Sequence, residues 1–344
     1  MDPETVQQVP AAEEAGAKTA GARDYYFDSY AHFGIHEEML KDTVRTLAYK
    51  NSILNNKHLF KDKIVLDVGC GTSILSMFAA KAGAKHVYGV DMSDIIHHAK
   101  KIVAENKLQD KITLIQGKME DIILPVDKVD IIISEWMGYF LLYESMLDTV
   151  LVARDRYLAK DGLIFPDKAT MYIAGLEDAE YKEEKLGFWN DVYGFTMSTI
   201  HDVAIKEPLV DTVNGDVVVS DPYMFKEIDI YTVKKEDLAF KVPFAIKAHR
   251  DDYVHAFICW FDTTFTSCHK HITLSTSPHS KYTHWKQTIF YFPDTLPVKK
   301  GDTITGSLSC KPNSRNPRDL DVEIEYSLES AAGSFKDKCS YTMC

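Results

Sequence analysis

The sequence predicts a two-domain protein in which an α/β domain with a mostly parallel sheet precedes an antiparallel β domain. Between Lys63 and Ser134, short apolar segments alternate with helix-like segments, a pattern typical of a parallel sheet covered on both faces. Beyond Phe165-Pro166, most segments have the composition of strands separated by turn residues. A chain of 344 residues is also long enough for two domains that each bury a core.

The predicted first domain covers residues 23–166 and follows a tail. Residues 1–22 are rich in Ala, Glu, Gln, Gly and Pro and contain no aromatic residue, so we predict a disordered N-terminal tail. Apolar residues at helical spacing, such as Met39 and Val44, predict helices across 35–59. Strands are expected at 64–68, 86–90, 112–115 and 129–134, with helices at 74–82 and 95–106 between them.

The predicted second domain covers residues 167–344. Strands are expected at 169–174, 225–233, 253–261, 288–292, 302–309 and 320–328, which together favour an antiparallel barrel or sandwich. The segment 178–193 is the exception, because its pattern is helical and unusually rich in aromatic residues.

Composition and charge limit the possible functions. The formal charge of −12 argues against a nucleic-acid-binding protein and favours cationic partners, although it also simply keeps a protein soluble. The six cysteines show no zinc-binding spacing, and no apolar run is long enough to span a membrane. Without a recognisable signal peptide, we expect reduced thiols in a cytosolic or nuclear protein.

A glycine-rich turn between the first predicted strand and helix is a candidate nucleotide site. Gly69 and Gly71 expose backbone N–H groups at a helix N-terminus, and Asp91 ends the next strand, where a carboxylate can accept from ribose hydroxyls. A dinucleotide fingerprint would need a third glycine at position 74, which is Ile74, so an NAD enzyme is disfavoured. A tight turn without any cofactor stays possible on this evidence alone.

Two glutamates enclose a nearly apolar segment after the strand that ends at Ser134. Glu135 and Glu144 flank Trp-Met-Gly-Tyr-Phe-Leu-Leu-Tyr, and a loop doubling back at Met137-Gly138 would bring both carboxylates to the ligand-binding edge of the sheet. Two such carboxylates repel each other unless a cation lies between them. A guanidinium fits this role, because its planar fork can pair with both.

These motifs together resemble a known family. Asp67-Val68-Gly69-Cys70-Gly71-Thr72 is similar to the first motif of class I S-adenosylmethionine-dependent methyltransferases. SEWMGYFLLYE, YTHWKQ and Tyr26-Phe27-x-x-Tyr30 resemble the double-glutamate loop, the Thr-His-Trp loop and the N-terminal tyrosine motif of protein arginine N-methyltransferases, type I in particular. The resemblance runs from about Asp24 to Leu328. It implies a Rossmann-like class I methyltransferase domain, then a β-barrel domain with a helical dimerisation arm at about 178–212.

The resemblance also implies roles for individual residues. Glu135 and Glu144 would clamp the substrate guanidinium, and His284, with Asp42 as its partner, would relay a proton or be purely structural. S-adenosylmethionine, yielding S-adenosylhomocysteine without any metal, would be bound by His36, Arg45 (at the methionine carboxylate), Asp67, Gly69, Gly71, Asp91 (at the ribose), Glu120 (near the adenine) and Met146 (beside the sulfonium). The substrate arginine would contact Tyr30, Met39, Tyr139 and Trp285, with Met39 otherwise a core helix residue.

The same resemblance implies partners and a location. Substrates would be arginine/glycine-rich and basic proteins, including histone tails, and the products would be monomethyl and asymmetric dimethylarginine. A homodimer or higher homo-oligomer is expected in the nucleus and cytoplasm, without direct binding to nucleic acid or membrane.

Ser73 is the clearest departure from the family pattern, which has glycine at this position. Serine could cap the following helix, and we expect it to permit cofactor binding, with some loss of affinity. The departure leaves one rival reading open, a binding protein built on a former methyltransferase scaffold. A second rival is a methyltransferase of this fold that acts on a small molecule or on nucleic acid.

Overall fold

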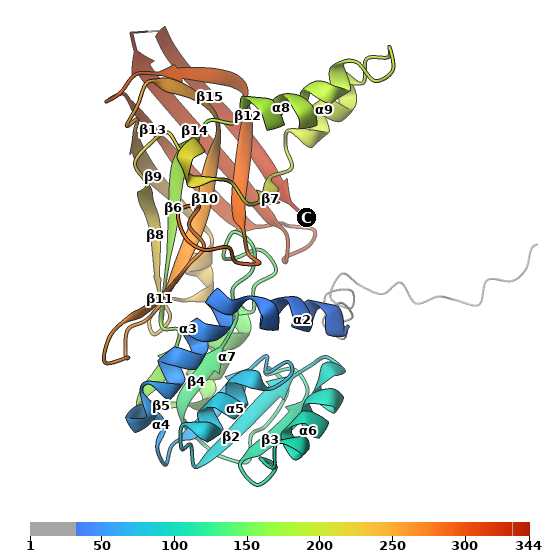
Figure 1. Cartoon of the computed structure of the whole chain (residues 1–344), viewed down its shortest axis with the longest axis vertical. Coiled ribbons are helices and arrows are strands. Elements are labelled where there is room, and N and C mark those ends of the chain that lie inside the picture. Colours follow the sequence, from blue (N-terminus) through green and yellow to red (C-terminus); the bar gives the residue numbers. More distant parts are fainter. Residues whose placement is uncertain (1–31, 332) are drawn as a thin grey trace, which may run out of the picture.

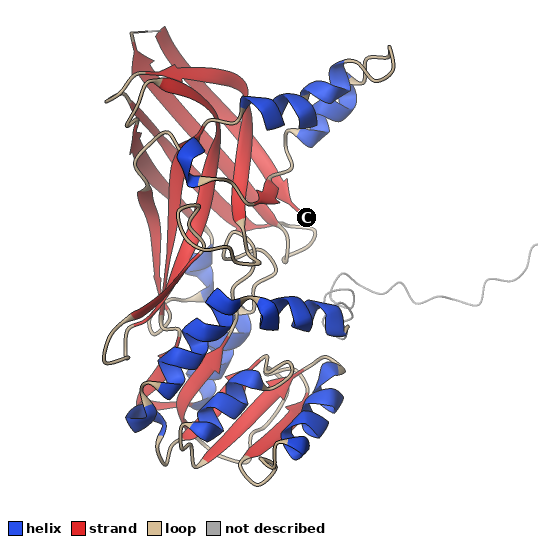
Figure 2. Cartoon of the chain, viewed as in Figure 1, coloured by secondary structure: helices blue, strands red, loops and turns tan. Residues whose placement is uncertain are grey.

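The computed structural model describes residues 32–331 and 333–344. The predicted tail at 1–22 and the predicted site residue Tyr30 therefore lie outside the described residues. The described chain forms an α/β unit and a β-rich unit that follow one another along the long axis of the molecule (Figure 1). Helices and strands alternate in the first unit, whereas strands dominate the second (Figure 2).

Among the described residues, three helices precede the first strand. They are α2 (Phe33–Lys41), α3 (Thr43–Leu54) and α4 (Lys57–Phe60). The helical segment expected at 35–59 is thus interrupted, and the first interruption is at Asp42. The Asp42 side chain accepts a hydrogen bond of 3.0 Å from the backbone N–H of Arg45, so it caps the N-terminus of α3.

The first unit contains a five-stranded parallel sheet in the order β3-β2-β1-β4-β5. The strands are β1 (Ile64–Val68), β2 (His86–Asp91), β3 (Ile112–Gln116), β4 (Val129–Ser134) and β5 (Leu158–Phe165), and the helices between them are α5 (Ile74–Lys81), α6 (Ile95–Glu105) and α7 (Leu147–Tyr157). The strand order reverses between β1 and β4, and α/β proteins bind ligands at the carboxyl edge of such a switch point. The strands and helices expected up to Ser134 are confirmed within a few residues, whereas α7 and β5 were not predicted.

The second unit consists of two antiparallel sheets. One has the order β7-β12-β10-β6-β8, with β11 paired to β10, and the other has the order β15-β14-β13-β9. Their strands are β6 (Lys168–Leu176), β7 (Leu209–Asp211), β8 (Tyr223–Asp229), β9 (Phe240–Lys247), β10 (Asp252–Phe265), β11 (Ile272–Ser275), β12 (Gln287–Val298), β13 (Thr303–Pro312), β14 (Leu320–Ser330) and β15 (Gly333–Met343).

Aromatic side chains from both antiparallel sheets share one core. Phe257 of β10 packs against Phe244 of β9 and Tyr326 of β14, with ring centroids 5.5 Å apart in each pair. The two sheets therefore enclose a common barrel-like interior, as the sequence predicted. The strands β7, β9, β11 and β15 were not predicted. Pro243 in β9 and the Lys and Ser residues of β15 weaken the strand pattern there.

The aromatic segment after β6 projects away from the barrel (Figure 1). It contains α8 (Ala179–Lys185), the 3-10 helix Gly187–Asn190 and α9 (Ser198–Ala204). The expectation of one helix over 178–193 was therefore wrong in its extent. The helix ends before Gly187, and Tyr193 has a left-handed backbone (φ 53°) in a turn between the short helices.

The two units meet at a short connection. The strand β5 ends at Phe165, the Phe165-Pro166 peptide bond is cis, and β6 begins at Lys168. Two further 3-10 helices, Gly215–Val217 and Lys235–Leu238, lie in the connections on either side of β8. Within the described residues, no helix has the length and apolar character that crossing a membrane requires.

Candidate active site

A cavity of about 1400 Å³ opens at the carboxyl edge of the parallel sheet and extends to the barrel. Its walls come from α2 and α3, the β1–α5 turn, the ends of β2 and β4, and two connections of the β domain. Sites for one small ligand usually measure about 300–1,000 Å³. This cavity is larger, so it has room for a cofactor and for part of a second reactant.

The glycine turn is shaped for close approach to the backbone. Gly69 has a left-handed backbone (φ 71°), and a Cβ atom there would lie 2.4 Å from the Cε atom of Met146. Gly71 is also left-handed (φ 50°), and a Cβ atom there would lie 3.2 Å from the ring of His36. Any other side chain is therefore unfavourable at both positions, because of the left-handed backbone and the close neighbours. Met146 and His36, both predicted to contact the cofactor, line the cavity beside the two glycines.

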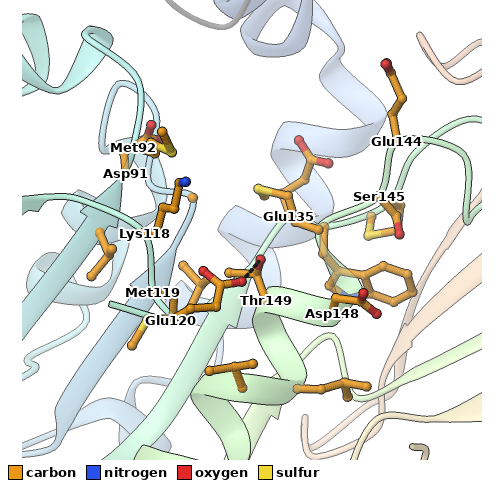
Figure 3. A pocket seen from close by; sticks show the side chains of 18 of the residues that line it. Asp91, Met92, Lys118, Met119, Glu120, Glu135, Glu144, Ser145, Asp148 and Thr149 are labelled. Carbon is orange, nitrogen blue, oxygen red and sulfur yellow. Dashed lines mark hydrogen bonds between the residues drawn. The ribbon is translucent and has the colours of Figure 1, made fainter. Parts of the chain in front are cut away.

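Asp91 and Glu120 line the same side of the cavity (Figure 3). One Asp91 oxygen accepts from the Gly71 N–H at 2.8 Å, and the other accepts from the N–H and hydroxyl of Ser93 at 2.8 Å and 2.7 Å. These bonds fix the carboxylate beside the turn, where it can accept from ribose hydroxyls. Glu120 accepts from the Thr149 hydroxyl at 3.1 Å.

Glu135 lies between Glu144 and the side of the cavity that carries Asp91 and Glu120 (Figure 3). Its Oε2 atom accepts from Nε and Nη2 of Arg45 at 2.9 Å and 2.8 Å, and both side chains are more than 90% buried. Arg45 also donates from Nη1 to the Met39 carbonyl at 3.2 Å. Arg45 was expected to face the methionine carboxylate of a cofactor. Its guanidinium group instead links α3 to Glu135, although the Arg45 side chain still lines the cavity.

The loop from Glu135 to Met146 doubles back as expected. Gly138 N–H donates to the Leu141 carbonyl at 3.0 Å, and Met146 N–H donates to the Trp136 carbonyl at 2.9 Å. A Cβ atom at position 138 would lie 1.7 Å from the Tyr143 carbonyl oxygen, so only glycine fits. Phe140, Leu141 and Glu144 all have left-handed backbones, with φ between 49° and 64°. This tightly folded loop brings Glu135 and Glu144 into one cavity.

Glu144 is positioned by the β domain. Its N–H donates to the Arg318 carbonyl at 3.2 Å, in the connection between β13 and β14. Burial raises the pKa of the Glu144 carboxyl above its ordinary value; the Arg318 guanidinium opposes this rise and Asp319 adds to it. The two glutamates thus differ, since Glu135 is held by Arg45 of the α/β unit and Glu144 faces Arg318 of the barrel.

Trp285 and Tyr139 do not line this cavity, so their expected contact with substrate is not seen. Trp285 is buried, and its Nε1–H donates to the Met137 carbonyl at 2.9 Å, which supports the glutamate loop from behind. Tyr139 is 38% exposed. Met39, by contrast, which was predicted to contact the substrate arginine, lines the cavity.

His284 and Asp42 form a pair outside the cavity. The Nδ1 atom of His284 lies 2.8 Å from Asp42 Oδ2, which also accepts from the His284 N–H at 2.9 Å. Although burial opposes its charge, hydrogen bonds from His284 and Arg45 hold the pKa of Asp42 below its ordinary value. His284 lines a shallow neighbouring groove and not the main cavity, so its placement favours a structural role over a direct proton relay.

Two residues near the glycine turn are buried beneath it. Asp67 is inaccessible and accepts from the Ser76 hydroxyl at 2.6 Å, and burial raises its pKa to about 7. It therefore supports the turn from below and was wrongly expected at the cofactor surface. Ser73 precedes α5, but its hydroxyl does not cap the helix, because its backbone is left-handed (φ 71°). The Cys70 thiol interacts with this hydroxyl, but the hydroxyl has no hydrogen bond of ordinary geometry among the described residues.

Several cavity residues were missed by the sequence analysis. Thr149 and Asp148 begin α7, an element that the sequence pattern did not indicate. Other residues reach the cavity from two connections of the β domain in which no site residue was predicted: Thr232, Lys234, Lys235, Glu236, Leu238, Arg315, Asn316 and Arg318. Among the described residues, no group of three His, Cys, Asp or Glu side chains could hold a metal ion.

Comparison with family models gives two matches along the chain. Residues 65–162 match a methyltransferase domain, and residues 167–331 match the arginine methyltransferase oligomerization subdomain. The boundary between the two matches coincides with the connection between β5 and β6.

Similar proteins extend over nearly the whole chain. "Protein arginine N-methyltransferase 1" of Schizosaccharomyces pombe is 63% identical, covering 94% of this chain and 96% of the relative. The Saccharomyces cerevisiae protein of that name is 57% identical, covering 95% and 96%. Among solved structures, the Trypanosoma brucei PRMT1 enzyme–prozyme heterotetrameric complex with AdoHcy matches with a TM-score of 0.90 and 48% identity, covering 92% of this chain and 100% of that chain. Arabidopsis thaliana protein arginine methyltransferase 10 matches with a TM-score of 0.85 and 31% identity, covering 93% and 100%.

Proposed function

Since the chain belongs to the protein arginine N-methyltransferase family, we propose that it methylates arginine side chains of other proteins with S-adenosylmethionine as donor. It is a type I enzyme, so its products are monomethyl and asymmetric dimethylarginine. The single observation that carries the proposal is the shared cavity. The glycine turn with Asp91 and the loop with Glu135 and Glu144 open into the same space.

The residues at one end of the cavity fit the cofactor. The close approach of Met146 to Gly69 and of His36 to Gly71 makes a narrow backbone cradle, and Asp91 is fixed beside it as an acceptor. When bound, S-adenosylmethionine supplies an electrophilic methyl group. Glu120 and Met119 line the part of the cavity where the adenine would lie.

The residues at the other end fit a guanidinium. Arginine is a weak nucleophile, because its positive charge is delocalised and its pKa exceeds 12. Glu135 and Glu144 can each pair with a guanidinium edge and draw the positive charge toward the nitrogens that they contact. This arrangement leaves electron density on the nitrogen that faces the methyl donor. The contribution of the protein is then mainly positioning and electrostatic stabilisation.

The test uses purified protein and labelled S-adenosylmethionine. We expect label on an arginine- and glycine-rich peptide but not on the same peptide with lysine in place of arginine. Mass analysis of the product should give monomethyl and asymmetric dimethylarginine. A folded preparation that binds the cofactor but labels neither peptide would favour a binding protein on a former methyltransferase scaffold. Label on nucleic acid or on a small molecule would favour the other rival.

The natural substrates that we propose are arginine/glycine-rich and basic proteins, including histone tails. Support comes from the net charge of −12 and from the carboxylates of Glu135 and Glu144. These two carboxylates define the acceptor end of the cavity, where the substrate arginine would bind. We further propose that the protein acts in both nucleus and cytoplasm. Imaging of the tagged full chain tests the location, and labelling of cell extract followed by mass spectrometry tests the substrates.

The arm between β6 and β7 supports self-association, and we propose a homodimer. Three of its aromatic or apolar side chains are largely exposed in the single chain: Tyr193 (96%), Phe195 (70%) and Val203 (63%). Exposed apolar side chains grouped on a projecting segment are typical of an interaction surface. The chain also matches the oligomerization subdomain of the family. Light scattering should show a dimer that dissociates when Tyr193 and Phe195 are changed to Ser.

A further inference from the structure

The connection between β13 and β14 is a structured loop that contacts the active-site loop. It runs from Asn313 to Asp319, and we refer to it as the asparagine loop. Asn313 N–H donates to the Asp319 carbonyl at 2.9 Å, and Asp319 N–H donates to the Asn316 carbonyl at 3.0 Å. The Asn313 side chain donates to Asp321 of β14 at 2.8 Å, which fixes the loop to the barrel.

Within this loop, the backbone of Arg318 makes two hydrogen bonds that position it. Its N–H donates to Asn316 Oδ1 at 3.2 Å, and its carbonyl accepts the N–H of Glu144 at 3.2 Å. Glu144 has a left-handed backbone (φ 52°), a conformation that non-glycine residues adopt only when surrounding contacts stabilise it. The hydrogen bond from Glu144 to Arg318 supplies such a contact from the other domain.

Among the described residues, Arg318 and Asp319 are the charged groups that shift the pKa of Glu144. Arg318 and Asp319 face it from the asparagine loop, with opposite effects on its carboxylate. Tyr143 and Tyr139 of its own loop are neutral near pH 7. Burial raises the pKa of Tyr143 to about 12 and also raises that of Tyr139. Glu135 is already paired with Arg45.

We propose that Arg318 is a positioning residue for Glu144, which it holds in place through its carbonyl and keeps ionised through its guanidinium. Each clamp glutamate then has its own arginine from a different domain, Arg45 for Glu135 and Arg318 for Glu144. Arg318 also lines the cavity beside Glu144, so the barrel sets the charge of the acceptor end. This inference rests on the proposed arginine methylation, because the ionised Glu144 is needed to pair with the substrate guanidinium.

The sign of the expected effect follows from the charges. Only the ionised form of Glu144 attracts a guanidinium, so activity falls as pH drops through the pKa of this carboxyl. Removing the Arg318 charge raises that pKa further, because burial and Asp319 are then unopposed. Removing the Asp319 charge lowers it. The two variants should therefore move the acid limb of the pH profile in opposite directions.

The experiment compares kcat/KM for an arginine–glycine peptide from pH 5 to 9 in wild type, Arg318→Met, Arg318→Lys and Asp319→Asn. For Arg318→Met we expect the acid limb to move upward by on the order of one pH unit. Its rate above pH 8.5 should stay within about threefold of wild type, because Glu144 is ionised there. Arg318→Lys keeps the charge and should restore most of the profile, whereas Asp319→Asn should shift the limb downward.

Lys311→Met is the matched control, since it removes one positive charge from the exposed end of β13 outside the cavity. It should leave the profile in place. A uniform loss of activity at every pH in Arg318→Met, with cofactor affinity retained, would show a merely structural role and overturn the inference. An unchanged profile would overturn it as well. An inactive wild type would instead contradict the proposed function, so the two failures are distinguishable.

Discussion

The cofactor end and the acceptor end of the cavity are held by different kinds of contact. At the cofactor end, Gly71 and Asp91 are twenty residues apart and bond directly across neighbouring strands. At the acceptor end, Glu135 is held by Arg45, ninety residues away, and Glu144 by the asparagine loop of the barrel. The difference shows that the cofactor end is built within the α/β unit, whereas the geometry of the acceptor site depends on both units.

This comparison predicts that charge changes in the glutamate loop separate the two functions. For Glu144→Gln we expect kcat to fall by about 10²–10³, because the neutral amide cannot attract the guanidinium, while cofactor affinity stays within about twofold. For Glu135→Gln we expect a similar fall in kcat and a change in cofactor affinity, since Arg45 loses its partner. Steady-state kinetics with isothermal titration of S-adenosylhomocysteine measures both quantities.

The control for these variants is Glu325→Gln on the outer face of β14, which removes one negative charge without touching the cavity. It should have near-normal kcat. Near-normal turnover in Glu144→Gln would contradict the clamp. Equal loss of cofactor affinity in both glutamate variants would contradict the separation of the two ends.

The converse change is Gly69→Ala in the cofactor turn. The new Cβ atom would meet Met146 and would force a non-glycine residue into a left-handed backbone, at a cost of about 1–2 kcal/mol. We expect cofactor affinity to fall by about tenfold or more, with kcat at saturating cofactor changed far less. Calorimetry and kinetics at several cofactor concentrations measure this split.

Gly301→Ala serves as its control. Gly301 also has positive φ (98°), but no described residue beyond its two neighbours has an atom within 4 Å of the position that a Cβ would take. It should lose a comparable amount of folding stability and keep its cofactor affinity. If both glycine variants weakened binding equally, the effect would come from general destabilisation and not from the cradle.

A third change tests whether the barrel supports the loop that carries Glu135 and Glu144. Trp285→Phe keeps an aromatic ring but leaves the Met137 carbonyl without its donor, which costs about 1–3 kcal/mol for a buried group. We expect kcat to fall by about tenfold without a change in cofactor affinity. Trp260→Phe, on the barrel wall against Tyr172, is the control and should lower the melting temperature without lowering kcat. Equal kinetics of the two variants would show that Trp285 is only a core residue.

The same contrast explains what the sequence could predict. The strand ends, the glycine turn, Asp91 and the doubling back at Gly138 depend on short segments, and periodicity and turn chemistry indicate such features directly. The Arg45–Glu135 pair, the Trp285–Met137 hydrogen bond and the Arg318–Glu144 contact depend on how distant segments pack. No local pattern encodes them. Trp285 was therefore expected in the substrate channel, although it supports the loop from behind.

Ser73 provides the smallest expected effect, and it concerns the stability of the cofactor end. Its backbone is left-handed and its buried hydroxyl has no ordinary hydrogen bond among the described residues, so both its Cβ and its Oγ are unfavourable there. Ser73→Gly removes both problems but adds entropy to the unfolded chain. We therefore expect a net gain of about 1 kcal/mol in the free energy of unfolding. Cofactor affinity should be unchanged or slightly tighter.

Ser73→Ala separates the two causes, since it removes the hydroxyl and keeps the Cβ atom. Urea unfolding should place its stability between wild type and Ser73→Gly, because the left-handed backbone stays unfavourable for alanine. If Ser73→Gly instead weakened cofactor binding markedly, the hydroxyl would be part of the binding site. Cofactor binding would then depend on the buried Ser73 side chain beneath the cavity wall. The cofactor end would in that case resemble the acceptor end, in that both would depend on the packing of distant segments.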